Sequence, residues 1–257
     1  MLKFIAKCKL THCSNDKLDF GKFKLDFLCD SMIKLINNCF LSGNFPECEK
    51  EGIISPLIKN FDLNPENLDA YRPVTELPVI PKLAEIAMHD RLTTHLDSRE
   101  ILPELQSALR PNHSTETALV KVHSDIINSL DNGKTVCMIF LDLSSAFDTV
   151  DHEILINELQ SIGIEGTALK LFKSYLENRT VRVSANGALS DPLPLKFGIP
   201  QGSVLAPTLF SIYTRTLSYL LKSLGVSFHI YADDTQIYFE CNPSDIDSIK
   251  AEIKLIF

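Results

Sequence analysis

The chain has 257 residues, of which 45% are apolar and 23% are charged, values typical of a folded protein and not of a disordered one. At about 150 residues per domain, this length corresponds to one large domain or two smaller ones. The 25 basic and 33 acidic residues give a net charge of −8, which argues against a protein that holds nucleic acid by general basicity alone.

The seven cysteines are irregularly spaced and contain no Cys-x-x-Cys pair, so they indicate neither a zinc site nor a disulfide framework. This cysteine usage favours a reducing, intracellular setting. No stretch of the sequence has the apolar length of a membrane span, and we therefore expect no membrane partner.

The first predicted element is an amphipathic helix over residues 25–40, where apolar residues follow helical spacing until Gly43 and Pro46. The β-branched segment 51–60 follows. We expect it to be an edge strand or a bulged strand, because Pro56 has no N–H to donate to a neighbouring strand.

Prolines divide residues 71–82 into short extended pieces, and Pro81 suits the first turn of the helix that is predicted next. A further helix is predicted to begin at Ser114 or Thr115. Its apolar positions keep the helical period until Asp131, where an Asp-Asn-Gly sequence ends it.

The most strand-like run covers residues 136–141, whose uninterrupted apolar side chains predict a strand buried on both faces and followed by Asp142. Helical segments are predicted at 154–162 and 169–176. The β-prone residues 180–197, with an Asn-Gly turn and a proline-broken second arm, predict a hairpin.

One long helix is predicted over residues 205–220, and it tolerates Pro207 because this proline falls in the first turn. A second hairpin covers residues 226–240, and a final helix is expected from about Ser244 to the C-terminus. Strands and helices thus come in mixed order with hairpins, which favours an α+β fold.

Three carboxylates occupy positions that can bring them together. Asp142 follows the buried strand, and Asp233 and Asp234 form the tip of the second hairpin. If the hairpin lies beside that strand, the carboxylates converge and require a hard cation such as Mg²⁺ or Mn²⁺ rather than zinc. Two such ions support an in-line displacement at phosphorus. The alternative for an Asp-Asp pair is an ordinary turn.

Three sequence blocks carry a family resemblance. FLDLSSAFDTVDH, GIPQGSVLAPTLF and YADDTQIY occur in this order and resemble motifs A, B and C of a reverse transcriptase, most closely those of LINE-type (non-LTR) retrotransposons. YRPVTELPVIPKLAE and RPNHSTETAL resemble the fingers motifs of the same family. The resemblance covers roughly residues 40–257.

The resemblance implies a right-hand polymerase fold with fingers and palm, in which an antiparallel palm sheet is covered by helices. It places an N-terminal extension with the amphipathic helix at 1–40, the fingers at 41–134 and the palm at 135–257. The palm would end after motif C, without the thumb and endonuclease domains of a full-length element. The implied activity is RNA-directed DNA polymerisation, with an RNA or DNA template, a DNA primer and dNTP.

The resemblance also implies roles for the carboxylates. Asp142 and Asp233 would be direct ligands of two Mg²⁺ ions, or of Mn²⁺, and the carbonyl of Leu143 would be a further ligand. Asp234 would assist catalysis more weakly.

Four residues would bind the nucleotide. Arg72 would clamp the triphosphate with help from Lys82, Phe147 would exclude a 2′-hydroxyl by its bulk, and Gln201 would contact the nucleotide or template. The alternatives are solvated surface cations, a core phenylalanine and a side chain at a helix start.

Three residues would lie near template and primer. Arg110 would support the fingers or template, Gly202 would allow a close approach of backbone in the Gly-Ile-Pro-Gln-Gly bend, and Tyr231 would pack near the primer end. A tyrosine in a strand is also an ordinary core residue.

Two other functions are compatible with parts of the sequence. One is a catalytically inactive retrotransposon fragment with at most weak nucleic-acid binding. The other is a two-metal phosphodiesterase-like hydrolase, which would not require the contexts of Phe147 and Gln201.

Overall fold

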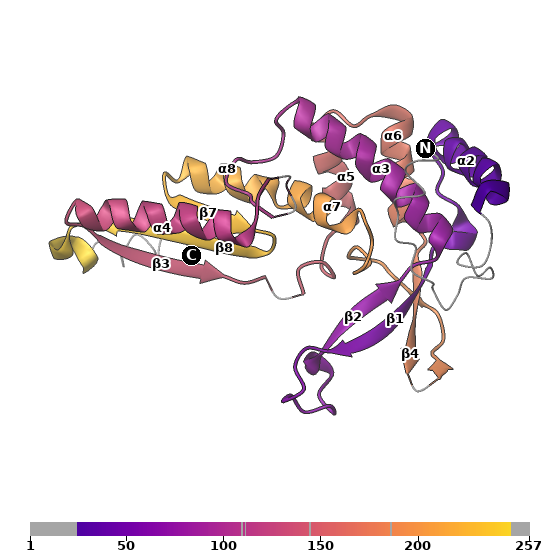
Figure 1. Cartoon of the computed structure of the whole chain (residues 1–257), viewed down its shortest axis with the longest axis horizontal. Coiled ribbons are helices and arrows are strands. Elements are labelled where there is room, and N and C mark those ends of the chain that lie inside the picture. The colour runs from indigo at the N-terminus through magenta and orange to yellow at the C-terminus, as the bar shows by residue number, and fades with distance from the viewer. Residues whose placement is uncertain (1–24, 109, 111, 144, 186, 248–257) are drawn as a thin grey trace. The chain divides into compact units, whose positions relative to one another are not determined.

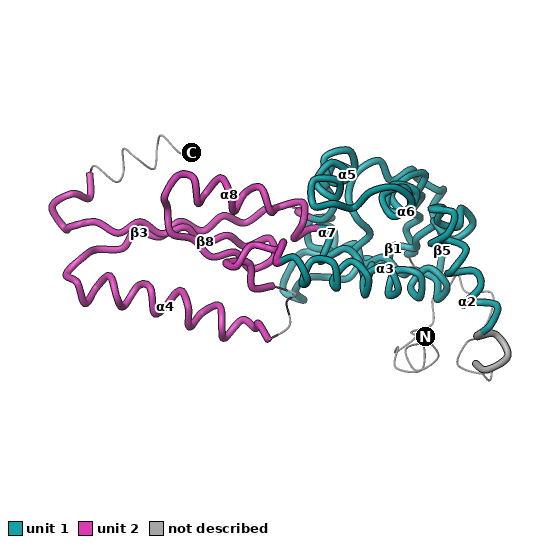
Figure 2. Tube along the Cα trace, turned by 90° about the horizontal axis from the view of Figure 1, so that it is seen from above, with its two compact units in different colours: residues 1–99, 147–209 teal, residues 100–146, 210–257 magenta. Residues whose placement is uncertain are grey.

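The computed structural model describes residues 25–108, 110, 112–143, 145–185 and 187–247. The chain divides into two compact units (Figure 2). Unit 1 comprises residues 1–99 and 147–209, and unit 2 comprises residues 100–146 and 210–257. The fingers and palm ranges expected from the family resemblance remain a prediction.

Unit 1 combines helices with a five-stranded sheet of order β2-β1-β4-β5, in which β6 also pairs with β4. Figure 1 shows β1, β2 and β4 side by side. The helices are α2 (Leu25–Ser42), α3 (Val79–Ser98), α5 (His152–Ser161) and α6 (Gly166–Leu176). The strands are β1 (Glu51–Ile58), β2 (Tyr71–Glu76), β4 (Thr180–Ala185), β5 (Ala188–Leu189) and β6 (Leu193–Pro194), and short 3-10 turns cover Glu47–Glu49 and Leu68–Ala70.

Strand β1 is not the edge strand expected from Pro56. It pairs with β2 on one side and in parallel with β4 on the other. The pairing with β4 ends at Ile54, however, so Pro56 lies opposite Pro73 where, within the described part of the chain, β1 has only β2 as a neighbour. A proline is tolerated there because no ladder hydrogen bond is lost.

Unit 2 is built on the three-stranded antiparallel sheet β3-β8-β7. Figure 2 shows these strands between α4 and α8. The elements are α4 (Thr115–Asp131), β3 (Thr135–Leu141), α8 (Arg215–Ser223), β7 (Ser227–Tyr231), β8 (Asp234–Cys241) and a 3-10 turn at Pro243–Asp245. Buried apolar side chains of α8, β7 and β8 form the core: Leu221, Phe228, Ile230, Ile237 and Phe239.

Strand β3 is only half-buried, so the expectation of a strand buried on both faces is wrong. Phe140 is 69% exposed. The reason is that, among the described residues, β3 is an edge strand of the sheet and pairs with β8 alone. An apolar run in the sequence does not distinguish an edge strand from a central one.

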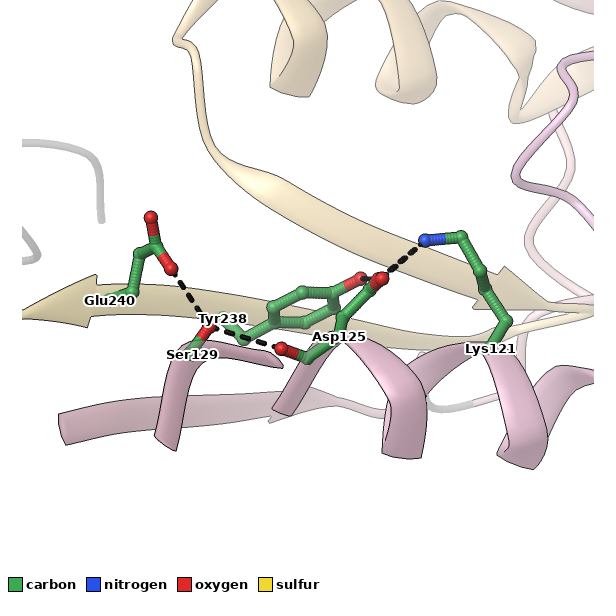
Figure 3. A network of polar contacts seen from close by, with 5 residues as sticks. All are labelled: Lys121, Asp125, Ser129, Tyr238 and Glu240. Atoms are coloured by element: carbon green, nitrogen blue, oxygen red, sulfur yellow. Dashed lines mark hydrogen bonds and ion pairs between the residues drawn. The ribbon is translucent and has the colours of Figure 1, made fainter. Parts of the chain in front are cut away.

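Helix α4 is held against β8 by a network of polar side chains (Figure 3). The hydroxyl of Tyr238 donates a hydrogen bond to Asp125, which also accepts from Lys121 Nζ at 2.6 Å. One turn further, Ser129 Oγ donates to Glu240 at 2.8 Å. Helix α4 begins at Thr115, one of the two predicted starts, and Ser114 caps its N-terminus.

The predicted single helix over 205–220 is two helices, α7 (Ala206–Tyr213) and α8. Between them, Thr214 lies at φ −85° and ψ 0°, outside helical geometry, and its Oγ1 donates to the carbonyl of Phe210 at 3.0 Å. Threonine is a weak helix former because its hydroxyl competes for backbone acceptors. The boundary between the two units falls within α7.

The other predicted elements are confirmed, including both hairpins and the positions of Pro81 and Pro207 in the first turns of their helices. The predicted α+β class is confirmed as well. The expected final helix begins with the turn at Pro243–Asp245 and then lies outside the described residues, as does most of the proposed N-terminal extension. Within the described part of the chain, none of the helices has the length and apolar character to cross a membrane.

Candidate active site

The two acidic positions of the second hairpin lie at its tip in unit 2. Tyr231 pairs with Asp234, which leaves Ala232 and Asp233 as a two-residue turn. Strand β3 runs antiparallel to β8 with Leu141 opposite Thr235. Extending this register by one residue places Asp142 across from Asp234.

The three carboxylates act on one another electrostatically. Loss of hydration, followed by the negative charges of Asp233 and Asp142, raises the pKa of Asp234 above its usual value. Asp142 and Asp234 are exposed and Asp233 is half-buried. In the part of the chain that the structure describes, no three His, Cys, Asp or Glu side chains are grouped closely enough to form a complete metal cage.

The donor set nevertheless suits a hard cation. Mg²⁺ commonly binds one or two carboxylates and completes its shell with water and substrate phosphates, so a protein cage of three ligands is not required. The negative charges of Asp233 and Asp142 add to the effect of burial in raising the pKa of Asp234. A bound cation would offset this negative charge. Leu143, whose carbonyl is a further predicted ligand, is exposed directly after Asp142.

The loop that leads into the second fingers block supports the hairpin turn through Gln106, a residue for which the sequence predicted no role. The side-chain amide of Gln106 accepts a hydrogen bond from the Ala232 N–H at 3.2 Å, and Gln106 is 2% exposed. Arg110, predicted to lie near the template, donates to the carbonyls of Pro103 and Gln106 at 2.8 and 3.3 Å. Its predicted contact with template remains a prediction, and the observed contacts close this loop.

In unit 1, the Gly-Ile-Pro-Gln-Gly bend lies against the second half of the motif A block. Gln201 Nε2 donates to both carboxylate oxygens of Asp148, at 3.0 and 2.9 Å. The backbone N–H of Ile199 donates to the carbonyl of Phe147 at 2.9 Å. Gly198 has φ +83°, and a Cβ there would lie 2.7 Å from the Asp148 carbonyl oxygen, so the approach requires glycine.

The same bend also contacts β2. The N–H of Thr75 donates to the carbonyl of Gln201 at 2.7 Å. Gly202 has φ +112°, and a Cβ at this position would lie 2.5 Å from the carbonyl oxygen of Thr75. Gly202 is therefore needed for the packing of the bend on β2, which also carries the exposed Arg72.

A buried polar cluster fixes the end of the bend. Glu85 of α3 is fully buried and accepts hydrogen bonds from Tyr175 at 3.0 Å, from Ser203 at 3.0 Å and from the Val204 N–H at 2.8 Å. Burial raises the pKa of Glu85, and the charge of the buried Arg179 opposes this shift. A glutamate inside a helical sequence gives no signal of burial, so sequence reasoning missed this cluster.

The predicted site residues fall in both units. Asp142, Leu143, Arg110, Tyr231, Asp233 and Asp234 belong to unit 2, whereas Arg72, Lys82, Phe147, Gln201 and Gly202 belong to unit 1. Phe147 and Lys82 are half-buried, as is Tyr231 at the end of β7. Their predicted roles stay predictions.

Comparison with known proteins identifies the family of the chain. Residues 58–255 match the model of the family described as "Reverse transcriptase (RNA-dependent DNA polymerase)". The chain belongs to the reverse transcriptase family, and the resemblance to LINE-type (non-LTR) retrotransposon enzymes predicted from the motifs is confirmed.

Several relatives come from mobile elements of Drosophila melanogaster. The chain is 34% identical over 241 residues to the RNA-directed DNA polymerase from mobile element jockey, covering 91% of this chain and 26% of the relative. It is 33% identical over 214 residues to a probable RNA-directed DNA polymerase from transposon X-element, covering 80% and 23%. A similar protein from transposon BS is 31% identical over 182 residues, covering 69% and 20%. The chain thus spans about a quarter or less of the length of these relatives.

Proposed function

We propose that this chain is the fingers and palm part of an RNA-directed DNA polymerase, which adds nucleotides from dNTP to a DNA primer on an RNA or DNA template. The observation that carries the proposal is the register of unit 2, since Asp142 follows β3 across from Asp234, beside the turn that contains Asp233. The sequence resemblance assigns these residues to motifs A and C, and the chain belongs to the reverse transcriptase family. The proposed palm is 135–257 and the proposed fingers are 41–134.

Asp142, Asp233 and the carbonyl of Leu143 would hold two Mg²⁺ ions. When bound, such ions favour ionisation of the attacking hydroxyl and offset charge on the phosphate oxygens. The primer 3′-oxygen would form a bond to the α-phosphorus while the bond to the bridging oxygen breaks and pyrophosphate leaves. Asp234, whose pKa is raised, would influence Asp233 and Asp142 through charge.

The residues of unit 1 would bind the incoming nucleotide. Arg72 offers a guanidinium that matches phosphate oxygens in bidentate geometry. Gln201 is oriented by its two hydrogen bonds to Asp148, and Asp148 directly follows Phe147 in the chain. Phe147 would then lie beneath the sugar and exclude a 2′-hydroxyl by its bulk.

Primer extension with Mg²⁺ tests this function. We expect Asp233→Asn to reduce extension by at least about 100-fold, because the contribution of metal ions to such transfers is several kcal/mol. The matched control is Asp131→Asn, which alters an exposed carboxylate at the end of α4 in the same unit.

Equal extension by the wild type and by Asp233→Asn would disprove the catalytic assignment. Absence of extension by the wild type, together with retained RNA binding, would instead favour a catalytically inactive fragment. Metal-dependent cleavage of nucleic acid without extension would favour a hydrolase.

A further inference from the structure

The tip of the β7-β8 hairpin has an unusual backbone for its sequence. Ala232, the first of the two turn residues, has φ +57°. Two-residue hairpin turns with a positive φ at this position normally use glycine, asparagine or aspartate, because a Cβ disfavours this conformation. An alanine therefore keeps this geometry only where its surroundings enforce it.

Gln106 provides contacts that enforce it. Its Oε1 accepts from the Ala232 N–H at 3.2 Å, and its Nε2 lies 3.5 Å from the Ala232 carbonyl oxygen, so one side-chain amide contacts both polar groups of the residue. Gln106 is 2% exposed, and its Oε1 also accepts from the Ala108 N–H at 3.1 Å. The buried amide is thus held by its own loop while it contacts the turn.

The loop around Gln106 is itself fixed to the free edge of β7. The Ser107 N–H donates to the carbonyl of Ile230 at 3.0 Å, and the Ile230 N–H donates to the carbonyl of Leu105 at 2.9 Å. The guanidinium of Arg110 closes the same loop through the carbonyl of Gln106. The backbone is therefore hydrogen-bonded on either side of Gln106, at Leu105 and Ser107, and it holds the side-chain amide next to the turn.

We propose that Gln106 is a positioning residue, whose amide holds the left-handed Ala232 and thereby sets the direction of the neighbouring Asp233 carboxylate. This inference rests on the proposed function, in which Asp233 is a metal ligand. Glutamine suits the role because its amide offers an acceptor and a donor on one planar group, which neither glutamate nor methionine does.

The test combines three variants of the full chain: Gln106→Ala, Ala232→Gly and the double variant. We expect Gln106→Ala to lower kcat of primer extension by about 10- to 100-fold, because a displacement of about 1 Å at a reacting group has effects of this size. The KM for dNTP should change by less than about threefold, since Gln106 contacts the turn and not the nucleotide residues of unit 1.

In the double variant, Ala232→Gly should raise kcat about tenfold above that of Gln106→Ala, because glycine adopts a positive φ without the strain that alanine has. A merely structural role of Gln106 predicts no such rescue. Gln160→Ala is the matched control, because Gln160 is an exposed glutamine of α5.

Hydrogen exchange provides a readout that does not depend on activity. In Gln106→Ala, the amide of Ala232 should exchange at least about tenfold faster, while amides of β3 and α4 keep their protection. If Gln106→Ala loses protection throughout unit 2, Gln106→Met replaces it, since methionine has a similar length and no hydrogen-bonding amide.

The outcomes separate the two proposals. A wild type without extension contradicts the proposed polymerase, while the exchange of the Ala232 amide still decides whether Gln106 holds the turn. If the wild type extends primers and Gln106→Ala has unchanged kcat or unchanged exchange at Ala232, the positioning role of Gln106 is wrong and the polymerase assignment stands. Absence of rescue by Ala232→Gly also contradicts the positioning role.

Discussion

His229 is a buried imidazole in the middle of β7, and it is 3% exposed. Its Nε2 lies 2.9 Å from Ser107 Oγ, and its Nδ1 has no hydrogen-bond partner within the described residues. Burial lowers the pKa of His229, and the charges of Lys121 and His113 lower it further, whereas Asp125 opposes them. The neutral imidazole is therefore the form that the folded protein prefers.

This preference makes the stability of unit 2 depend on pH. The pKa of His229 is lower in the folded chain than in the unfolded one, so the contribution of the neutral ring is fully present above about pH 6.5 and is lost as pH falls through the lowered pKa. We expect urea denaturation between about pH 8 and pH 5 to show a stability loss of at most about 1.4 kcal/mol per pH unit below pH 6.5.

Two histidine variants check the assignment. His229→Gln should reduce this slope, whereas His123→Gln, which alters an exposed histidine of α4, should leave it unchanged. An unaltered slope in His229→Gln would mean that another group causes the dependence.

At the residue scale, the sequence predicted site residues from their motifs and missed residues whose environment is unusual. Asp142, Asp233 and Gln201 were predicted as site residues because they occupy defined positions in motifs A, C and B. Gln106 and Glu85 were not predicted to matter, since a polar side chain is normally exposed and only the folded chain reveals that these two are buried with partners.

The bend that carries Gln201 illustrates what a single glycine does for an element. Gly202 combines φ +112° with a Cβ position 2.5 Å from the carbonyl oxygen of Thr75. Gly133 after α4 also has a positive φ, +71°, but a Cβ there would meet nothing within 4 Å. An alanine at Gly133 would have backbone strain alone, whereas an alanine at Gly202 would have backbone strain and steric overlap.

We expect Gly133→Ala to reduce the free energy of unfolding by about 1 kcal/mol, the strain of alanine at positive φ. Gly202→Ala should reduce it by about 2 to 4 kcal/mol, because the bend must also move away from β2. Gly202→Ala should in addition raise the KM for dNTP, which Gly133→Ala should not do. Urea denaturation and primer extension measure both effects, and equal losses in the two variants would contradict a close contact at Thr75.

Sequence patterns predicted the kinds of elements well and their surroundings less well. The helical period over 205–220 continues through Thr214, so it could not reveal that the helix is interrupted there. The apolar run of β3 indicated a strand correctly but not its place at the sheet edge, since strand order depends on pairing between distant segments.

For the whole molecule, the division into two units has a thermodynamic consequence. Each unit contains a polar network centred on a tyrosine hydroxyl. In unit 1, Tyr175 donates to Glu85 at 3.0 Å. In unit 2, Tyr238 donates to Asp125 of α4 (Figure 3). Removal of either hydroxyl leaves a carboxylate with one donor fewer, which costs about 1 to 3 kcal/mol where the acceptor is buried.

We expect Tyr175→Phe to accelerate amide exchange mainly in α3 and α6, and Tyr238→Phe to do so mainly in α4 and β8. The loss should be larger for Tyr175→Phe, because Glu85 is fully buried whereas Asp125 is partly exposed. Exchange measured by mass spectrometry on both variants provides the check. If either variant deprotects both units equally, the units do not behave as separate cooperative regions.

The sequence by itself determined the α+β class, most element positions and the family, because these depend on local periodicity and on motif residues whose chemistry is specific. It also excluded nucleic-acid binding by general basicity through the net charge of −8. Only the tertiary structure decided which polar residues are buried together, that β3 is an edge strand, and that Gln106 contacts the turn beside Asp233. These features arise from contacts between segments 90 or more residues apart, such as Tyr175 with Glu85 and Gln106 with Ala232, and no local pattern records such contacts.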